Sequence, residues 1–389
     1  MNTQSLSRRS FCHSLAASAA GVALADTAQA AANEWLLYVG TYTNAETKSE
    51  GVYVYRFNAA TGEIKPSSLA KSPSPAFLAI DAKRRFLYAA NEVGEFNGKK
   101  NGGVTAFSIS QQTGELAQLN QQPAPGVPAH ITVHPSGRFV LIADYGGGNA
   151  AIYPVKLDGS LGAMSDVAQH TGKGADPKRQ SEPHAHCIIV DAAGKYAFVP
   201  DLGLDKVMIY SIDAQLGKLI AHGSTAVKPG AGPRHFVFHP SGEFAYVINE
   251  LNSTVTMFEY IPARGTLSEV QSISTLPADF KGTSYCADIH IHPTGKFLYG
   301  SNRGHNSIVI YAIDAKTKKL TLVGHEPVRG DWPRNFGLDP TGQFLLVANQ
   351  RSNNIVVFRI DVKTGLLKAT EQTVELGAPV CLKFIPAFS

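Results

Sequence analysis

Short apolar strands separated by polar turns follow one another along the chain from about residue 34 to its end. Apolar and β-branched residues alternate or run together over a few positions, and Gly, Pro, Asn and Asp gather between these stretches. Apolar residues do not recur at the spacing of an amphipathic helix. The pattern therefore predicts an all-β protein.

The predicted strands are grouped in a repeated unit of four. Each unit opens with a short strand, in most copies led by proline, which turns at a His-Pro or Asp-containing segment and returns in a second strand with a polar end. A third and a fourth strand follow. Six copies begin at residues 75, 128, 183, 233, 286 and 333. Such repetition is typical of solenoids and propellers.

A seventh unit is divided between the two ends of the chain. Residues 34–69 supply second, third and fourth strands without a first, and APVCLKFIP at residues 378–386 is a first strand with nothing after it. Joined together, they complete one unit and close a ring that leaves only short, protected sheet edges. We expect a single seven-bladed β-propeller domain over residues 31–389, with four antiparallel strands per blade and roughly 51 residues in each.

Residues 1–30 have the features of a twin-arginine (Tat-type) signal peptide. Arg8 and Arg9 stand within SRRSF, an alanine-rich apolar run follows, and Ala28-Gln29-Ala30 is a small-x-small cleavage site. The apolar run is too short for a stable membrane anchor. The sequence thus predicts export by the Tat machinery to the periplasm or the medium.

Composition excludes several other classes of protein. The formal net charge of +4 includes the arginines of the leader, and no basic run indicates a nucleic-acid partner. No G-x-S-x-G, H-E-x-x-H or C-x-x-C motif occurs, so we expect neither a metal nor another cofactor. Cys187, Cys286 and Cys381 fall on first strands of blades that are not neighbours, and we interpret them as buried thiols.

The propeller geometry predicts where a site lies. A first strand begins, and a second strand ends, at the same rim of the channel. The residues that start the first strands at this rim are Ala76, Ala129, His186, Arg234, Ala287, Arg334 and Val380. The residues that end the second strands are Tyr42, Glu92, Tyr145, Leu202, Glu250, Arg303 and Gln350. Structural positions of a repeat should be alike, whereas these differ in chemistry.

Imidazole, carboxylate and guanidinium groups converge on one arc of this rim, which suits an anion-binding pocket that transfers protons. The predicted catalytic residues are His186, Arg234, Glu250 and Arg303. The predicted substrate-binding residues are His184, His235, Arg334 and Asn335.

Simpler interpretations of the same residues stay open. Arg234 and Glu250 can form an ion pair that ties the rim together, and Arg303 and Arg334 can be solvated. His184 and His186 alternate on a strand and can ligate a metal, although no third ligand follows at a recognisable spacing.

Several of these segments together resemble the seven-bladed lactonase family, which includes the propeller type of 6-phosphogluconolactonase and the carboxy-cis,cis-muconate cyclases. The segments are EPHAH (182–186), GPRHFVFHPSG (232–242), SNRGHNSI (301–308), PRNF (333–336) and ANQRSNNI (348–355). The resemblance covers nearly all of the chain after the leader. It implies a cofactor-free enzyme in which a His, two Arg and a Glu act, and these fall on His186, Arg234, Arg303 and Glu250.

The functional hypothesis is a lactone hydrolase that opens a sugar-acid lactone to its aldonic acid by general acid/base activation of water, with arginine stabilisation of charge. Phosphorylated sugar lactones belong to cytosolic metabolism, so an export signal favours an unphosphorylated substrate. The alternatives are a muconate-type lactonising cyclase and a non-catalytic periplasmic binding propeller. The sequence does not determine the oligomeric state.

Overall fold

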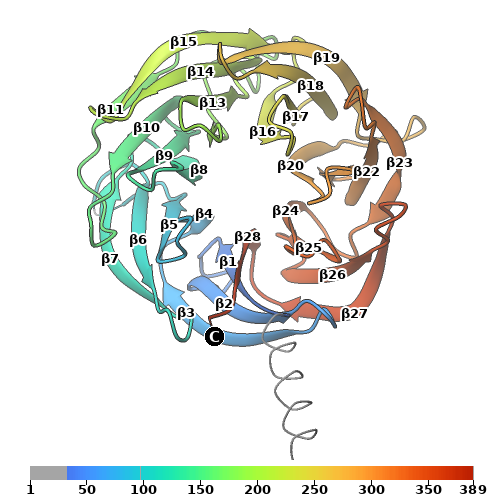
Figure 1. Cartoon of the computed structure of the whole chain (residues 1–389), viewed down its shortest axis with the longest axis horizontal. Helices are drawn as coiled ribbons and strands as arrows, with labels where there is room; N and C mark the ends of the chain where they lie inside the picture. Colours follow the sequence, from blue (N-terminus) through green and yellow to red (C-terminus); the bar gives the residue numbers. More distant parts are fainter. Residues whose placement is uncertain (1–32, 97, 389) are drawn as a thin grey trace, which may run out of the picture.

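Seven sheets stand around a central channel in the computed structural model, which describes residues 33–96 and 98–388 (Figure 1). Each sheet is a blade of four antiparallel strands, with the first strand at the channel and the fourth at the outside. The predicted fold is confirmed. The predicted signal peptide, residues 1–30, lies outside the described residues. In the part of the chain that the structure describes, no helix has the length and apolarity to cross a membrane.

The blades follow one another in chain order. Blade 1 contains β28 (Pro379–Pro386), β1 (Glu34–Thr41), β2 (Gly51–Asn58) and β3 (Ile64–Lys71). Blade 2 contains β4 (Pro75–Ile80), β5 (Phe86–Asn91), β6 (Gly103–Ile109) and β7 (Leu116–Pro123). Blade 3 contains β8 (Pro128–Val133), β9 (Phe139–Asp144), β10 (Asn149–Pro154) and β11 (Asp166–Gln169). Blade 4 contains β12 (Ile189–Val190), β13 (Tyr196–Asp201), β14 (Lys206–Asp213) and β15 (Lys218–Ala226).

The remaining three blades complete the ring. Blade 5 contains β16 (Pro233–Phe238), β17 (Phe244–Asn249), β18 (Thr254–Ile261) and β19 (Thr266–Ser274). Blade 6 contains β20 (Tyr285–Ile291), β21 (Phe297–Arg303), β22 (Ser307–Ile313) and β23 (Leu320–Pro327). Blade 7 contains β24 (Pro333–Leu338), β25 (Phe344–Asn349), β26 (Asn354–Ile360) and β27 (Leu367–Glu375).

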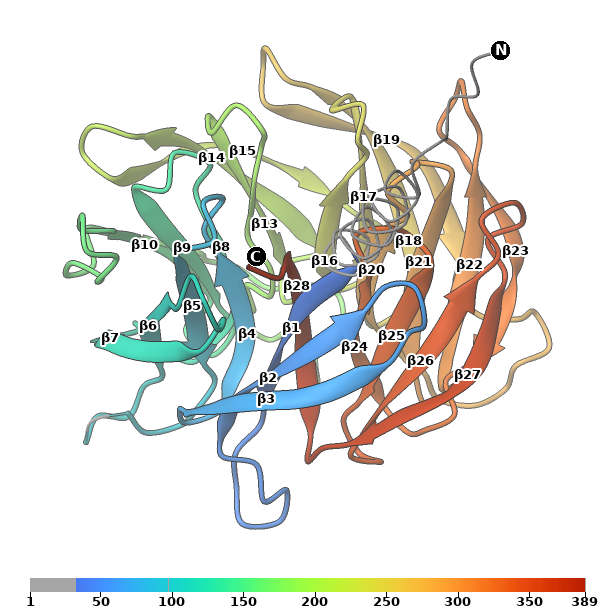
Figure 2. The same cartoon turned by 60° about the horizontal axis from the view of Figure 1, so that its bottom comes forward.

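The two ends of the chain close the ring in blade 1, as the divided seventh repeat predicted. β28 pairs with β1 in an antiparallel register that sets Trp35 opposite Pro386 and Tyr38 opposite Lys383. Figures 1 and 2 show the dark red β28 beside the blue β1. This pairing covers the edge that β1 would otherwise expose.

Burial falls from the inner strands to the outer ones. The second strands are almost wholly apolar and buried, as FVLIAD in β9 and FLLVAN in β25 illustrate, because a neighbouring blade packs on each face. The fourth strands are largely exposed, as in β19. The core therefore lies between blades. Leu37 and Phe57 of blade 1, for example, cluster with Phe344 and Leu346 of blade 7.

The turn between first and second strands requires a left-handed residue. Gly242 in the HPSG turn of blade 5 has φ of 73°, which a residue without Cβ adopts at no steric cost. In blade 2 the turn has no glycine, and Arg84 occupies the equivalent position with φ of 57°.

The histidines of the His-Pro turns join neighbouring blades. Each ring bonds a hydroxyl two residues on through Nδ1 and a glycine carbonyl of the next blade through Nε2. His292, for example, lies 2.8 Å from Thr294 Oγ1 and 2.8 Å from the carbonyl oxygen of Gly342. The repeated His-Pro turns thus contribute to the contact between blades as well as to the turn itself.

Tyrosines on second strands form a further set of links between blades. Tyr88 on β5 donates its hydroxyl to the carbonyl oxygen of Gly159 in blade 3 at 3.0 Å, and Tyr299 on β21 donates to that of Gly365 in blade 7 at 2.9 Å. Both tyrosines are fully buried. These bonds fasten the outer hairpin of one blade to the inner strands of the blade before it.

The three cysteines of the described chain are free and buried. Cys187, Cys286 and Cys381 lie on or beside first strands, and burial raises the pKa of each thiol. The interpretation of these residues as buried thiols is confirmed.

Replacing Tyr88 with Phe tests the tyrosine links. The change removes one hydrogen bond between blades and leaves the Gly159 carbonyl without its donor, so the free energy of unfolding should fall by about 0.5–1.5 kcal/mol in urea denaturation. Tyr55→Phe on β2 is the control, since no hydrogen bond of its hydroxyl occurs among the described residues. An equal effect of both changes would show that the link contributes nothing.

Candidate active site

A β-bulge at the start of most first strands determines which side chains face the channel mouth. In blade 5, Pro233 pairs with Asn249 and His235 pairs with Ile248, so Arg234 has no partner on β17. The same shift leaves Arg334 unpaired in blade 7. A bulge breaks the two-residue alternation of a strand and redirects the extra side chain.

A cavity of about 220 Å³ occupies the mouth of the channel at the rim where first strands begin. Its lining residues are Glu92, Ala129, Tyr145, Arg179, His186, Glu250, Arg303 and Arg334. They come from blades 2 to 7 and from the loop between β11 and β12. The cavity is thus assembled from segments spread over most of the chain.

Glu250, directly after β17, is the centre of the charged network. Its Oε1 lies 2.8 Å from Nη2 of Arg179, and its Oε2 lies 3.0 Å from Nε of Arg234 and 2.8 Å from Nη2 of Arg303. The carboxylate is buried, with 7% of its side chain exposed. One carboxylate therefore holds guanidinium groups from blades 5 and 6 and from the loop that precedes blade 4.

These contacts determine the charge states at the mouth. Burial by itself would raise the pKa of Glu250, but Arg303, Arg234 and Arg179 outweigh burial and lower the pKa to about 2. Burial, Arg303 and Arg334 lower the pKa of Arg234 to about 9. At neutral pH the carboxylate is ionised and the arginine protonated, so both charges are present.

His186 lines the cavity on the side of blade 4. Burial, followed by the charges of Arg234 and His235, holds its pKa well below 6.5, so the ring is neutral at neutral pH. Its ring lies edge-on to Tyr145 at 5.4 Å between centroids. Among the described residues, the buried Nδ1 of His186 has no hydrogen-bond partner. A neutral imidazole of this kind can carry a proton during a reaction.

A second cluster of charges lies across the mouth. Arg334 Nη2 is 3.4 Å from Oε2 of Glu92, which also accepts the hydroxyl of Tyr42 at 2.7 Å. The guanidinium of Arg334 sits 5.3 Å from the Tyr42 ring centroid. Three arginines and two glutamates line the mouth, and a fourth arginine, Arg234, lies behind Glu250, so the cavity favours an anionic ligand.

The cavity has a floor, defined here as Phe77, His130, His235, Asp288 and Asn335. The rings of Phe77 and His130 lie 4.0 Å apart between centroids and are tilted by 33°, and His130 lies edge-on to His235 at 5.6 Å. His235 Nδ1 is 2.7 Å from Oδ1 of Asp288, whose Oδ2 accepts the amide of Asn335. A separate chamber of about 430 Å³ lies on the other side of Phe77 and His130.

The predicted site residues therefore fall into two groups. His186, Glu250, Arg303 and Arg334 line the cavity. Arg234 does not: it is 1% exposed, and its guanidinium bonds Glu250, His235 and the carbonyl of Ala287. Arg234 thus lies behind Glu250, as in the ion-pair alternative, and its catalytic role stays a prediction.

The other three predicted substrate-binding residues do not line the cavity either. His235 and Asn335 belong to the floor, where Asp288 holds both. His184 stacks behind Tyr145 at 4.4 Å between centroids and bonds the Tyr145 carbonyl through Nδ1. The bulge explains the position of His235, because it turns two consecutive residues toward the channel at different depths.

Arg179 is the residue that sequence reasoning missed. It lies in the loop between β11 and β12, and aligning the units on their turns says nothing about loops. Gln180 anchors this loop by donating to the carbonyl of Leu202 and to Oδ1 of Asp205, each at 2.7 Å. The only signal in the sequence was an arginine in a polar loop just before EPHAH.

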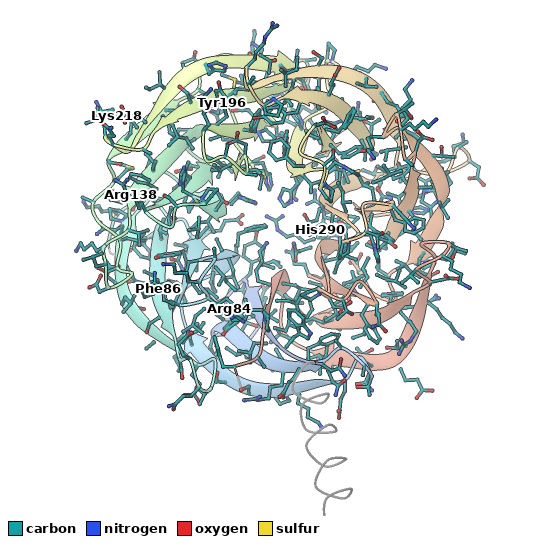
Figure 3. The ribbon with its side chains drawn as sticks, viewed as in Figure 1. Arg84, Phe86, Arg138, Tyr196, Lys218 and His290 are labelled. Carbon is teal, nitrogen blue, oxygen red and sulfur yellow. The ribbon has the colours of Figure 1, made fainter. Side chains whose placement is uncertain are left out.

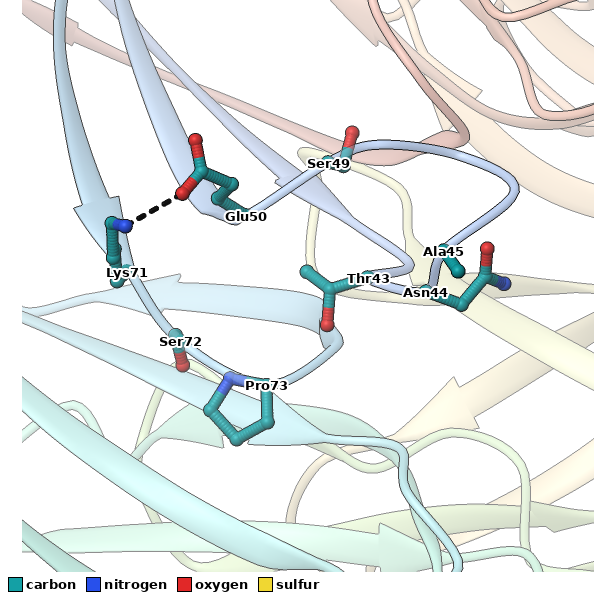
Figure 4. A pocket seen from close by; sticks show the side chains of 8 residues that line it. All are labelled: Thr43, Asn44, Ala45, Ser49, Glu50, Lys71, Ser72 and Pro73. Carbon is teal, nitrogen blue, oxygen red and sulfur yellow. Dashed lines mark ion pairs between the residues drawn. The ribbon is translucent and has the colours of Figure 1, made fainter.

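Two larger hollows on the surface are weaker candidates. Figure 4 shows one of about 610 Å³, where Lys71 and Glu50 pair at 2.7 Å. Both are largely exposed, so the hollow offers no buried charge to a ligand. The other, of about 560 Å³, lies beside the mouth and shares Glu92 with the cavity. The mouth cavity, in contrast, brings together His186, Glu250 and Arg303, which are buried and have shifted pKa values.

Residues 33–96 and 98–388 contain no group of three or more His, Cys, Asp or Glu side chains arranged to hold a metal ion. Figure 3 shows His290 at the channel wall, where its Nε2 bonds Asp288 at 2.9 Å. His184 and His186 both pack on the ring of Tyr145, at 4.4 and 5.4 Å between centroids, and neither belongs to a group of this kind.

The fold and the mouth together define a seven-bladed propeller with an arginine-rich pocket around one carboxylate. Residues 36–384 match the family model described as "Lactonase, 7-bladed beta-propeller". The chain is 37% identical to a 6-phosphogluconolactonase of Bacillus subtilis, over 90% of this chain and 99% of that one. It is 38% identical to a 6-phosphogluconolactonase of Formosa agariphila, over 78% of this chain and 86% of that one.

A solved structure gives the same result. The periplasmic gluconolactonase of Pseudomonas aeruginosa superimposes with a TM-score of 0.86 at 34% identity, covering 91% of this chain and 99% of that one. The chain belongs to the seven-bladed β-propeller lactonase family, and the resemblance inferred from its motifs is confirmed.

Glu250→Gln tests the central carboxylate. The change leaves Arg234 and Arg303 buried without their counter-ion, so the free energy of unfolding at neutral pH should fall by about 3–5 kcal/mol. Denaturant titration of the variant and of Glu259→Gln, a control at an exposed position of β18, measures this.

The pH dependence gives an independent check on the same variant. Because the pKa of Glu250 is lower in the folded protein than the 4.5 of the free side chain, its stabilisation is full above about pH 4.5 and is lost as the pH falls toward 2. The free energy of unfolding of the Glu250→Gln variant should therefore fall less than that of the wild type over this pH range. The same dependence of unfolding free energy on pH for wild type and variant would contradict the ion pairs assigned to Glu250.

Proposed function

We propose that the protein hydrolyses the lactone of a sugar acid, opening the ring to the free aldonic acid. The observation that carries the proposal is the mouth cavity, where arginines, an ionised carboxylate and a neutral imidazole meet in a member of the lactonase family. Hydrolysis is favoured over lactone formation because the relatives are named gluconolactonases and 6-phosphogluconolactonases.

In the proposed mechanism the guanidinium groups that line the cavity stabilise the negative charge that develops on the carbonyl oxygen. These groups belong to Arg179, Arg303 and Arg334. Arg234 acts from behind by fixing Glu250, which in turn holds the other guanidinium groups at the mouth.

His186 carries the proton. Water attacks the carbonyl carbon while His186 accepts a proton from that water. The bond between the carbonyl carbon and the ring oxygen then breaks, and His186 returns the proton to the ring oxygen. The carboxylic acid product then ionises and releases one proton to the solvent. His186 is preferred to Glu250 because three guanidinium groups occupy the Glu250 carboxylate, whereas Nδ1 of His186 has no hydrogen-bond partner among the described residues.

An unphosphorylated lactone is the proposed substrate, and the periplasm the proposed location. Arg8 and Arg9 in the twin-arginine pattern support export, and the Pseudomonas aeruginosa structure is that of a periplasmic gluconolactonase. Phosphorylated sugar lactones arise in the cytoplasm, away from an exported enzyme.

Replacing Arg8 and Arg9 with lysine tests the location. Recognition by the Tat machinery requires the arginine pair, so cell fractionation and blotting should find the wild type in the periplasm and the variant in the cytoplasm. Periplasmic accumulation of both would exclude the proposed export route.

His186→Ala tests the mechanism. Proton release from glucono-δ-lactone and its 6-phosphate, corrected for spontaneous hydrolysis, should show turnover by the wild type and a loss of about 10²–10⁴-fold in kcat for the variant. His222→Ala is the control, because this exposed histidine lies on the outer strand β15. Near-wild-type turnover by His186→Ala would reject the role of His186.

The same two lactones distinguish the proposed hydrolase from the alternative functions. Turnover of neither lactone by the wild type would favour a binding propeller or a lactonising cyclase. Preference for the 6-phosphate would overturn the choice of an unphosphorylated substrate while leaving the hydrolase in place.

A further inference from the structure

The three arginines that hold Glu250 differ in how firmly they are fixed. Arg234 is 1% exposed and also bonds His235 and the carbonyl of Ala287. Arg303 has 6% of its side chain exposed, and it donates to the carbonyls of Cys286 at 2.8 Å and Tyr285 at 3.3 Å. Neither guanidinium can leave Glu250 without breaking buried hydrogen bonds to the backbone.

Arg179 is held far more loosely. Its side chain is 35% exposed, and among the described residues its only ion pair is the one with Oε1 of Glu250. Beyond that pair the guanidinium lies near the hydroxyl of Tyr145 and 5.7 Å from the ring centroid of Tyr285, and among the described residues it makes no hydrogen bond to a backbone carbonyl. A partly exposed ion pair is worth little because water competes for both charges. Of the three partners, Arg179 is therefore the one that can exchange Glu250 for another ligand.

The loop that carries Arg179 is nevertheless fixed in place. Gln180 is fully buried, its side chain bonds blade 4 through Leu202 and Asp205, and its backbone N–H donates to Asp176 at 2.7 Å. An exchange would thus move the Arg179 side chain while the loop backbone stays where it is. The guanidinium remains at the cavity in either position.

The Arg179–Glu250 pair matches one edge of an aldonolactone. The pair consists of a hydrogen-bond donor beside an acceptor, and the lactone presents a carbonyl acceptor beside the hydroxyl donor of the adjacent carbon. We propose that Arg179 is an exchangeable clamp, whose guanidinium leaves Glu250 for the lactone carbonyl while Oε1 of Glu250 accepts the adjacent hydroxyl.

The clamp rests on the proposed function and defines its substrate class: lactones with a hydroxyl on the carbon next to the carbonyl. A lactone without that hydroxyl would leave Oε1 of Glu250 unpaired once Arg179 had moved. Arg179 would then return to Glu250, and the carbonyl would lose a donor. The preference thus arises from the loss of two hydrogen bonds to charged groups.

Titration calorimetry of the product acids tests the clamp without any need for turnover. Wild type should bind gluconate about 10- to 100-fold more tightly than 2-deoxygluconate, since a hydrogen bond to a charged group contributes this much. Arg179→Gln should bind gluconate about 10- to 100-fold more weakly than wild type, and Arg179→Lys should recover part of the loss because lysine keeps the charge without the planar fork.

The control is Arg264→Gln, an exposed arginine in the turn between β18 and β19, which should bind as wild type does. Equal affinity of wild type for the two acids, no binding of either, or unchanged gluconate binding by Arg179→Gln would overturn the clamp. If the Arg179–Glu250 pair had only a structural role, Arg179→Gln would bind gluconate as wild type does, because the change would only free Glu250 for the ligand.

Failure of the clamp and failure of the proposed function are separable. If the binding pattern holds and no lactone is hydrolysed, the clamp stands and the hydrolase is rejected. If glucono-δ-lactone is turned over while Arg179→Gln binds gluconate normally, the hydrolase stands and the clamp is rejected.

Discussion

Pairing of β28 with β1 is the contact on which the channel mouth depends. The two strands come from opposite ends of the chain, and their pairing turns an open row of sheets into a ring. Only in a closed ring does Arg334 of blade 7 reach Glu92 of blade 2, a partner 242 positions away. The cost of this closure grows only slowly with the length of the enclosed chain, so a long repeat can afford it. The interblade bonds of the turn histidines and tyrosines then hold each blade to the next.

Within the ring, the mouth concentrates charges that protein interiors usually avoid. A buried charge is tolerated when a partner of opposite sign and several hydrogen bonds compensate for lost hydration. Glu250 satisfies this condition for Arg234 and Arg303, which also donate hydrogen bonds to the backbone carbonyls of Ala287 and Cys286. The arginines nevertheless outnumber the glutamates, so the carboxylates of the protein do not balance the guanidinium charges at the mouth. An anionic transition state or product completes this balance, which connects the stability of the mouth with the chemistry that we propose there.

The floor beneath the cavity keeps this arrangement in place. Asp288 accepts hydrogen bonds from His235 and Asn335, which lie on the first strands of blades 5 and 7. His235 in turn contacts Arg234, so the guanidinium is supported from below as well as by Glu250. The site thus has fixed groups on its inner side and one loosely held arginine, Arg179, at its outer side.

Particular residues show how far the sequence could be used to predict this protein. The four-strand repeat determined the fold, the closing strand at residues 378–386 and the rim of the site, because strand direction alone decides which ends meet. His186, Glu250, Arg303 and Arg334 followed from that rule and do line the cavity.

The tertiary structure alone decided how deep each side chain lies in the channel, which residues support the cavity from behind, and which loop residues reach it. The bulges set Arg234 behind Glu250 and His235 in the floor, since a local change of register is invisible in an alternating pattern. Arg179 reaches Glu250 over 71 positions from a loop that no repeat alignment describes. The sequence by itself determined the fold, through a periodic pattern of strands. Which side chains touch was settled only when the closed ring brought distant segments together, because side-chain contacts depend on three-dimensional packing.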